Sequence, residues 1–123
     1  MLKLHTRNFG NVAVLRLQGR IVNGETEILR EAVRSLSEVS TVILDMTRVT
    51  TVDAGGLGVM LELRAQVESK GIRFELRNVT KLVRMVLEMT RLDSVFRIKA
   101  GVEFFPAVSR SRRADAVKLA SCA

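Results

Sequence analysis

The stretch TVDAGGLGVMLELRA, residues 51–65, places an aspartate and three small residues directly before an apolar run with helical spacing. The Asp53 carboxylate can accept hydrogen bonds from the backbone N–H groups of Gly55 or Gly56, as a helix N-cap does. The two glycines leave those N–H groups uncovered, and such a helix N-terminus favours negative charge. The turn is therefore either only a cap in a tight turn or a binding site.

The residues that common catalytic turns require are missing from this stretch. A phosphate-binding P-loop needs G-x-x-x-x-G-K-S/T, a dinucleotide site needs G-x-G-x-x-G, and a nucleophile elbow needs G-x-S-x-G. GGLGVML has no lysine, no hydroxyl and none of these spacings. The only histidine, His5, and the only cysteine, Cys122, lie at opposite ends of the chain, which argues against a zinc site or a Cys–His dyad. We expect no enzyme activity, no metal and no cofactor.

The composition indicates one domain with its own core. The chain has 123 residues, 47% of them apolar, with five Phe and no Trp or Tyr, so we expect an aliphatic core and no nucleic-acid partner. No segment approaches the roughly 20 apolar residues of a membrane span, residues 1–10 have no apolar stretch long enough for a signal peptide, and the single cysteine suits a cytoplasmic protein. The net charge is +7, and the positive charge is densest over residues 99–123, where 5 Lys and Arg face 2 Asp and Glu.

Hydrophobic periodicity predicts an alternation of strands and helices. Strands are expected over residues 2–6, 12–17, 41–46, 72–77 and 94–98, the fourth with one solvent-facing side of Arg73, Glu75 and Arg77. Helices are expected after Asn23 or Gly24, over 55–69, and from Asn78 to about Met89, with a short final helix near 111–120. Their inward residues are Ile28, Leu29, Ala32, Val33 and Leu36 in the first helix and Val79, Leu82, Val83 and Val86 in the third. This order predicts an α/β sandwich, a mixed but mostly parallel sheet of four to five strands with helices packed on it.

The run from about Val12 to Ile98 resembles a STAS domain, the fold of sulfate transporters and anti-sigma factor antagonists, in its free-standing bacterial form. The features that carry the likeness are Leu44-Asp45 at a strand end, Asp53 before Gly56-Leu57-Gly58, Gly71, and Asn78-Val79. The resemblance implies a STAS domain over 1–98 followed by a basic extension over 99–123. It also implies a cytoplasmic regulator of transcription, a monomer or weak dimer, that binds an anti-sigma factor of the serine-kinase type.

The chain departs from the family pattern at one position. A typical antagonist carries Asp-Ser-Ser-Gly at this turn, and its second serine is phosphorylated by the anti-sigma factor. Ala54 and Gly55 stand here in place of the two serines. A phosphate would add roughly −1.5 to −2 charges at the interface, and Gly55 has no oxygen to carry one. The resemblance therefore implies an antagonist that phosphorylation at this site does not switch off.

Three further interpretations remain open. Thr47, Thr50 and Thr51 could replace the missing phosphorylation site, although they precede the helix and would present a phosphate elsewhere. A second apolar stripe of Leu57, Leu61 and Ala65 either packs under a neighbouring helix or forms a partner-binding patch continuous with the turn at Asp53. In the second case the predicted partner-binding residues are Asp53, Ala54, Gly55, Gly56, Leu57 and Leu61. The alternative function is a STAS subunit of a lipid-transporting ABC complex, whose partner would be the transporter ATPase.

Overall fold

The computed structural model describes residues 1–100, so the predicted extension from residue 101 onward and its helix near 111–120 lie outside the described residues. Within residues 1–100 the elements are β1 (Lys3–Phe9), β2 (Val12–Ile21), α1 (Glu27–Arg34), β3 (Thr41–Val52), α2 (Ala54–Glu68), β4 (Arg73–Arg77), α3 (Lys81–Met89) and β5 (Arg97–Lys99). The predicted order of strands and helices is confirmed. No helix in this part of the chain has both the length and the apolar character needed to cross a bilayer.

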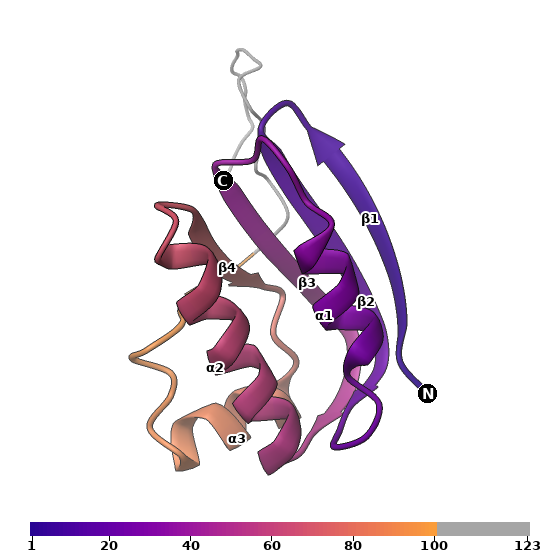
Figure 1. Cartoon of the computed structure of the whole chain (residues 1–123). Helices are drawn as coiled ribbons and strands as arrows, with labels where there is room; N and C mark the ends of the chain where they lie inside the picture. Colours follow the sequence, from indigo (N-terminus) through magenta and orange to yellow (C-terminus); the bar gives the residue numbers. More distant parts are fainter. Residues whose placement is uncertain (101–123) are drawn as a thin grey trace.

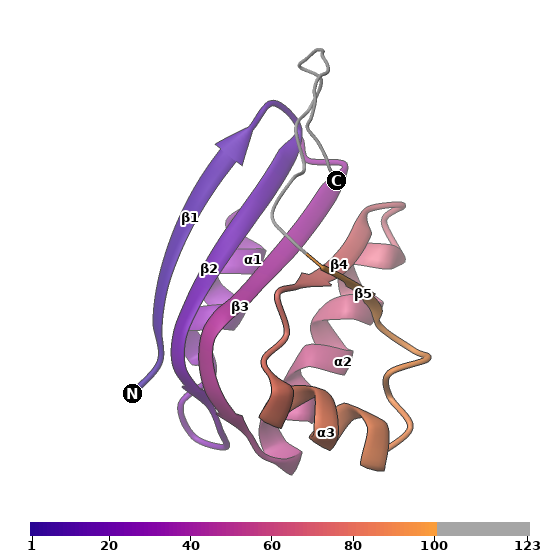
Figure 2. The ribbon, with the colours of Figure 1, turned by 180° about the vertical axis from the view of Figure 1, so that it is seen from behind.

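The five strands form one mixed sheet in the order β1-β2-β3-β4-β5. The hairpin of β1 and β2 is antiparallel, whereas β3, β4 and β5 each run parallel to the strand before them. Helices α1 and α2 lie against one face of the sheet (Figure 1), and the opposite view shows β1, β2 and β3 with no helix in front of them (Figure 2). The α/β sandwich that the sequence predicts is therefore present, with one sheet face free of helices over the first three strands.

The hydrophobic core lies between the helix-covered face of the sheet and the three helices. Leu15 of β2, Leu44 of β3 and Met60 of α2 are fully buried there. The core is mostly aliphatic, as predicted, but Phe74 and Phe96 add an aromatic pair with ring centroids 6.2 Å apart.

The predicted caps of the first and third helices are wrong. Helix α1 is capped at Thr26 rather than at Asn23 or Gly24, and α3 is capped by Thr80, whose hydroxyl oxygen accepts a hydrogen bond from the N–H of Val83. Asn78 has a left-handed φ of +56°, which does not fit the extended backbone of an N-cap residue. Its side-chain amide instead donates to Asp45 at 3.4 Å.

Two predicted inward residues face solvent instead. Ile28 is 44% exposed and Leu82 is 64% exposed, because α1 and α3 present neighbouring positions to the core. In α3 the fully buried positions are Val83 and Leu87. The predicted helical spacing is correct for both helices, but these two positions lie outside the buried face.

The solvent-facing side predicted for β4 is also wrong, since Glu75 and Arg77 are both buried. Arg77 donates to Glu75 Oε1 at 2.9 Å, and Arg73 and Lys99 also pair with this carboxylate. Burial by itself raises the pKa of Glu75, but the hydrogen bonds from Arg77 and Arg73 outweigh it and hold the pKa below its ordinary value. A charged pair can therefore be buried at a position where alternation predicted exposure.

Candidate functional site

The turn before α2 is organised by the carboxylate of Asp53. Its Oδ1 accepts a hydrogen bond from the N–H of Gly56 at 2.8 Å, which confirms the predicted N-cap of α2. Both carboxylate oxygens also accept from the backbone N–H of Asn23 at 3.1 Å. The bonds from Gly56 and then from Asn23 hold the pKa of Asp53 below its ordinary value, because they stabilise the charged form. One side chain thus ties the β2–α1 loop to the start of α2.

Gly56 is required because the chain passes too close to β2 for any side chain. A Cβ at this position would lie 1.8 Å from the carbonyl oxygen of Ile21 and 2.7 Å from its carbonyl carbon. The same Ile21 carbonyl accepts the backbone N–H of Asp53 at 3.3 Å. The glycine therefore allows α2 to begin directly against the end of β2.

Gly55, which stands at the position of the second serine that the resemblance implies for a typical antagonist, is covered by the β2–α1 loop. A Cβ there would lie 2.7 Å from the Cβ of Asn23 and 3.1 Å from its Cα. Gly58, one turn further on, has open space where its Cβ would be. The chain therefore lacks the side chain at position 55, and Asn23 occupies part of the space that such a side chain would need.

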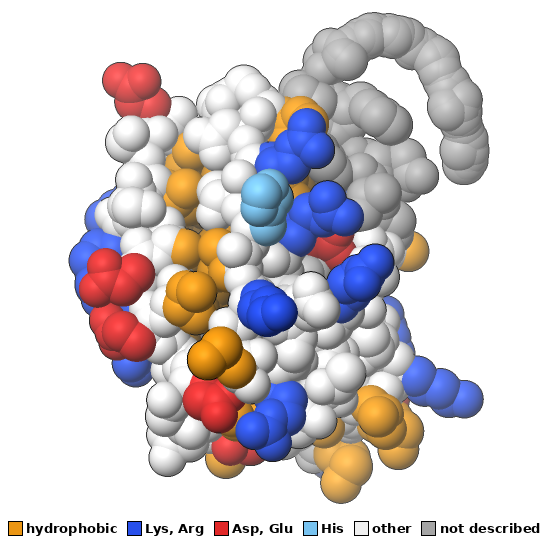
Figure 3. Space-filling view, turned by 90° about the vertical axis from the view of Figure 1, so that its right-hand side faces the viewer, with side chains coloured by type: hydrophobic (Ala, Val, Ile, Leu, Met, Phe, Trp, Pro, Cys, Tyr) orange, Lys and Arg blue, Asp and Glu red, His pale blue; other side chains and the backbone are white. Residues whose placement is uncertain are grey.

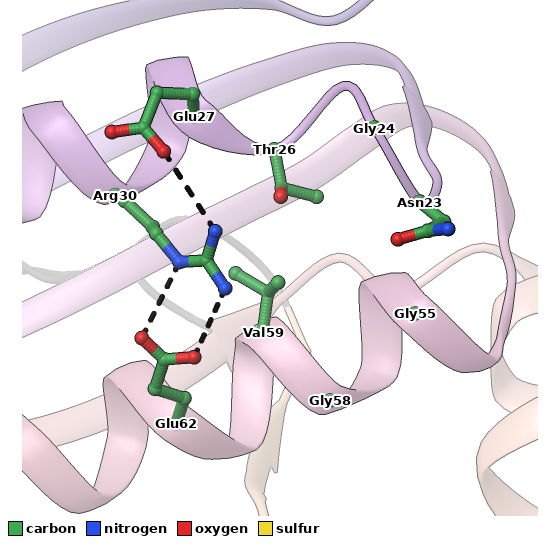
Figure 4. Close-up of a pocket in the computed structure, with 9 residues that line it drawn as sticks. All are labelled: Asn23, Gly24, Thr26, Glu27, Arg30, Gly55, Gly58, Val59 and Glu62. Carbon is green, nitrogen blue, oxygen red and sulfur yellow. Dashed lines mark hydrogen bonds and ion pairs between the residues drawn. The ribbon is translucent and has the colours of Figure 1, made fainter.

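A groove of about 540 Å³ runs between the β2–α1 loop, α1 and the first two turns of α2 (Figure 4). Gly24, Gly55 and Gly58 expose backbone along it, and Asn23 lies at the end nearest the Asp53 turn. Its lining is polar backbone and charged side chains with a single apolar contributor, Val59. Such a surface suits a polar segment of another protein better than an apolar ligand.

The far end of the groove is closed by an ion pair between the two helices. Arg30 of α1 donates to both carboxylate oxygens of Glu62 in α2, at 3.1 and 3.3 Å, and it also pairs with Glu27 at 3.7 Å. The hydrogen bond and charge of Glu62 raise the pKa of Arg30 above its already high ordinary value. This two-point contact sets the spacing of the helices on either side of the groove.

The predicted partner-binding residues are not equally accessible. Asp53 and Ala54 are exposed and Gly55 is half-buried, whereas Gly56 and Leu57 are buried, with Leu57 only 7% exposed. Leu61 is half-buried and packs on the core, and Ala65 is exposed. In the second apolar stripe, Leu57 is therefore buried in the core, as the packing interpretation expects, whereas Leu61 is only partly buried. Of these six predicted residues, Asp53 and Ala54 are the most accessible.

Sequence reasoning missed the contribution of the β2–α1 loop. The sequence predicts Asn23 or Gly24 as the cap of α1, but the backbone of Asn23 binds Asp53 and its side chain covers Gly55. Arg30 and Glu62 were not singled out at all. The only local signal was the Asn23-Gly24 pair directly after a strand, which indicates a turn but not its neighbour 30 residues away.

The three threonines that could carry a relocated phosphate are all exposed in the last part of β3. Thr47 donates its hydroxyl to Asp45 Oδ1 at 2.6 Å, and Thr50 donates to the carbonyl of Gly19 at 3.2 Å. A phosphate on Thr47 would replace that donor and bring negative charge to a carboxylate. Thr51, which makes no side-chain hydrogen bond within residues 1–100, is the least constrained of the three.

Residues 1–100 form an α/β fold with a mixed sheet, in which the capped turn at Asp53 leads from β3 into α2. The sequence profile of the STAS domain matches residues 3–108, and the chain therefore belongs to the STAS domain family. The predicted division at residue 98 stays a prediction.

Solved structures with the same fold include an anti-sigma factor antagonist from Mycobacterium paratuberculosis, with a TM-score of 0.70, 17% identity, and coverage of 80% of this chain and 85% of that one. The unphosphorylated anti-sigma factor antagonist SpoIIAA of Bacillus gives a TM-score of 0.68 at 23% identity, over 82% and 90% of the two chains. A sulfate transporter family protein from Wolinella succinogenes gives 0.65 at 22% identity, over 72% and 75%. At these identities the likeness is one of fold.

Proposed function

We propose that this protein is an anti-sigma factor antagonist that binds an anti-sigma factor of the serine-kinase type, in a non-catalytic role, through the Asp53 turn and the adjoining groove. The observation that carries the proposal is the exposed N-terminus of α2. Asp53 and Ala54 are accessible there, and Gly58, with no atom within 4 Å of where its Cβ would be, leaves the helix backbone open to a partner (Figure 4). The STAS family match and the antagonist structures with the same fold support it.

The same turn supports an antagonist that is not released by phosphorylation at residue 55. Gly55 has no oxygen, and Asn23 fills part of the space where a side chain would extend. A phosphate brings roughly −1.5 to −2 charges, which would disrupt an interface formed at this turn. Without it, binding of the anti-sigma factor would depend on the amount of this protein rather than on the ATP-driven kinase reaction.

Recovery of the partner from the native host is the first test. Affinity purification of the full chain should recover a kinase-like anti-sigma factor, and an Asp53→Ala, Ala54→Arg variant should lose it. An Ala65→Arg variant, altered on an exposed position further along α2, is the matched control and should retain it. Recovery of an ABC transporter ATPase instead would overturn the proposal in favour of the alternative function.

Restoring a serine tests the missing switch directly. With the partner kinase and ATP, the native chain should incorporate no phosphate at residues 47–55 and should stay bound. A Gly55→Ser, Asn23→Gly variant, in which the loop side chain no longer occupies the space, should be phosphorylated and released. A Gly58→Ser variant places the hydroxyl on open helix surface. It should not be phosphorylated and should not be released from the anti-sigma factor. Phosphate found by mass spectrometry on Thr47, Thr50 or Thr51 of the native chain would show that the switch has moved rather than disappeared.

A further inference from the structure

The helix-free face of the sheet carries basic side chains from three adjacent strands. In β1 and β2, Lys3 is opposite Gln18 and His5 is opposite Arg16, while Arg48 of β3 is the register partner of Gln18. Residues that face one another across strands point to the same side of the sheet. Lys3, Gln18 and Arg48 therefore form one row across the strands, and His5 and Arg16 begin the next.

A β-bulge brings Arg48 into this row. The register of β2 and β3 shifts between the Arg16–Asp45 and Gln18–Arg48 pairs, so β3 has one more residue than β2 at this point. Thr47 and Arg48 are consequently both exposed, although strict alternation would bury one of them. Bulges commonly redirect a side chain, and here the redirected side chain is a cation.

These cations differ from most others on the surface because they have no acidic partner. Arg20, Arg30, Arg34, Arg64, Arg73, Arg77, Arg97 and Lys99 each pair with a glutamate. Within residues 1–100, Lys3, Arg16 and Arg48 make no ion pair and no side-chain hydrogen bond. The nearest carboxylate in register, Asp45, accepts hydrogen bonds from Thr47 and Asn78 through Oδ1 and forms no ion pair with these cations.

The cations also line a concave surface. Lys3, His5, Arg16, Gln18 and Arg48 border a depression of about 230 Å³. A second depression of about 420 Å³ shares Arg16 and Arg48 and adds the polar side chains of Asp45, Thr47 and Asn78. In Figure 3 Lys and Arg side chains border the histidine, drawn in pale blue. Adjacent strands are about 4.8 Å apart, so the three cations converge across about 10 Å, within reach of one bound group.

We propose that this depression on the helix-free face is a binding site for a phosphate-class oxyanion, held by Lys3, Arg16 and Arg48 with Gln18 and His5 as further hydrogen-bonding groups. Guanidinium groups bind phosphate through two parallel hydrogen bonds. Two of them with an ammonium group supply three positive charges, more than the roughly 1.5 to 2 negative charges of a phosphomonoester. The site belongs to the faces of β1, β2 and β3, not to the turn before α2. It therefore stands or falls independently of the proposed partner binding.

Two probes distinguish the source of the phosphate. Inorganic phosphate and glycerol phosphate, titrated into the labelled full chain, should shift the backbone amide NMR signals of residues 3–5, 16–18 and 47–48. Phosphatidylcholine vesicles with and without phosphatidate test a lipid headgroup by co-sedimentation. Response to the soluble phosphates indicates a small ligand, and response only to phosphatidate vesicles indicates a membrane lipid; either supports the site.

Charge-matched variants show whether the effect is local. Arg16→Gln and Arg48→Gln should each weaken binding roughly tenfold, because each removes a charge-assisted pair of hydrogen bonds. Arg84→Gln removes an exposed cation of α3 that is also unpaired within residues 1–100, and it should change binding by less than about twofold. No response to any probe, or equal weakening by Arg84→Gln, would overturn the proposal.

Discussion

Gly56 and Gly58 give a sharp test of how α2 is positioned, since the same Gly→Ala change should have opposite effects two residues apart. At position 56 the new Cβ would lie 1.8 Å from the Ile21 carbonyl oxygen, whereas 3.0 Å is the closest approach that real Cβ atoms make. The start of α2 must therefore move by about 1.2 Å. At position 58 no atom lies within 4 Å of the new Cβ.

The expected magnitudes follow from that geometry. Overpacking costs about 1–3 kcal/mol, and moving Ile21 weakens its bond from the Asp53 N–H, which contributes about 1 kcal/mol. The helical preference for Ala over Gly returns about 0.5–1 kcal/mol. Gly56→Ala should therefore destabilise the fold by about 2–3 kcal/mol, and Gly58→Ala should stabilise it by about 0.5–1 kcal/mol.

Urea unfolding of the full chain, followed by circular dichroism, measures both variants against the native protein. With a slope of about 1.5 kcal/mol per M, the two midpoints should differ by about 2 M. The slope itself should be unchanged if both variants unfold from the same compact state. If the Gly56→Ala variant were as stable as the Gly58→Ala variant, α2 would not approach β2 as closely as the structure shows. The geometry of the Asp53 turn would then also be incorrect.

Three further predictions concern the loop, the buried ion pair and pH. Gly55→Ala should lower the free energy of unfolding by about 1 kcal/mol in the native background, but it should be neutral or slightly stabilising when combined with Asn23→Gly. A double-mutant cycle of urea unfolding midpoints measures this coupling, and additive effects of the two substitutions would contradict the steric argument. Glu75→Gln should lower the free energy of unfolding by roughly 2 kcal/mol, because it leaves the buried Arg77 guanidinium without its carboxylate, whereas Glu31→Gln in an exposed pair should change it by less than about 0.5 kcal/mol. The folded state holds the pKa of Asp53 below its ordinary value, so the stabilising contribution of this carboxylate is complete above about pH 4, the ordinary value, and is lost as the pH falls through the folded-state pKa. The amide NMR signals of Gly56 and Asn23 should move together in that pH range. A Gly56 signal that titrated without the Asn23 signal would exclude a carboxylate shared by the two amides.

Much of the fold is determined by local patterns in the sequence. The apolar spacing after Asp53 predicts a helix over 55–69, within one residue of α2 at each end, and Asp53 is recognisable as its cap, because both depend on neighbours within one or two turns. The hairpin, the order of elements and the parallel pairing follow from strand spacing and the handedness of crossovers. The absence of a serine at position 55 is likewise visible directly in the chain.

The errors arise where distant segments meet. The sequence predicts Asn23 or Gly24 as the cap of α1, but the tertiary fold brings Asn23 to Asp53, 30 residues away, and α1 begins at Glu27 with Thr26 at its N-cap position. Alternation predicted Glu75 to face solvent, and only the cations gathered around it by β4 and β5 make its burial favourable.

The sequence by itself determined the class of fold, the helix capped by Asp53 and the absence of a hydroxyl at positions 54 and 55, since each depends on residue type and short-range spacing. The tertiary structure alone decided that Asn23 covers position 55, that Gly56 faces the Ile21 carbonyl, and that unpaired cations of three strands share one depression. These features depend on packing distances of a few ångströms between segments far apart in the chain, and no local pattern encodes such distances.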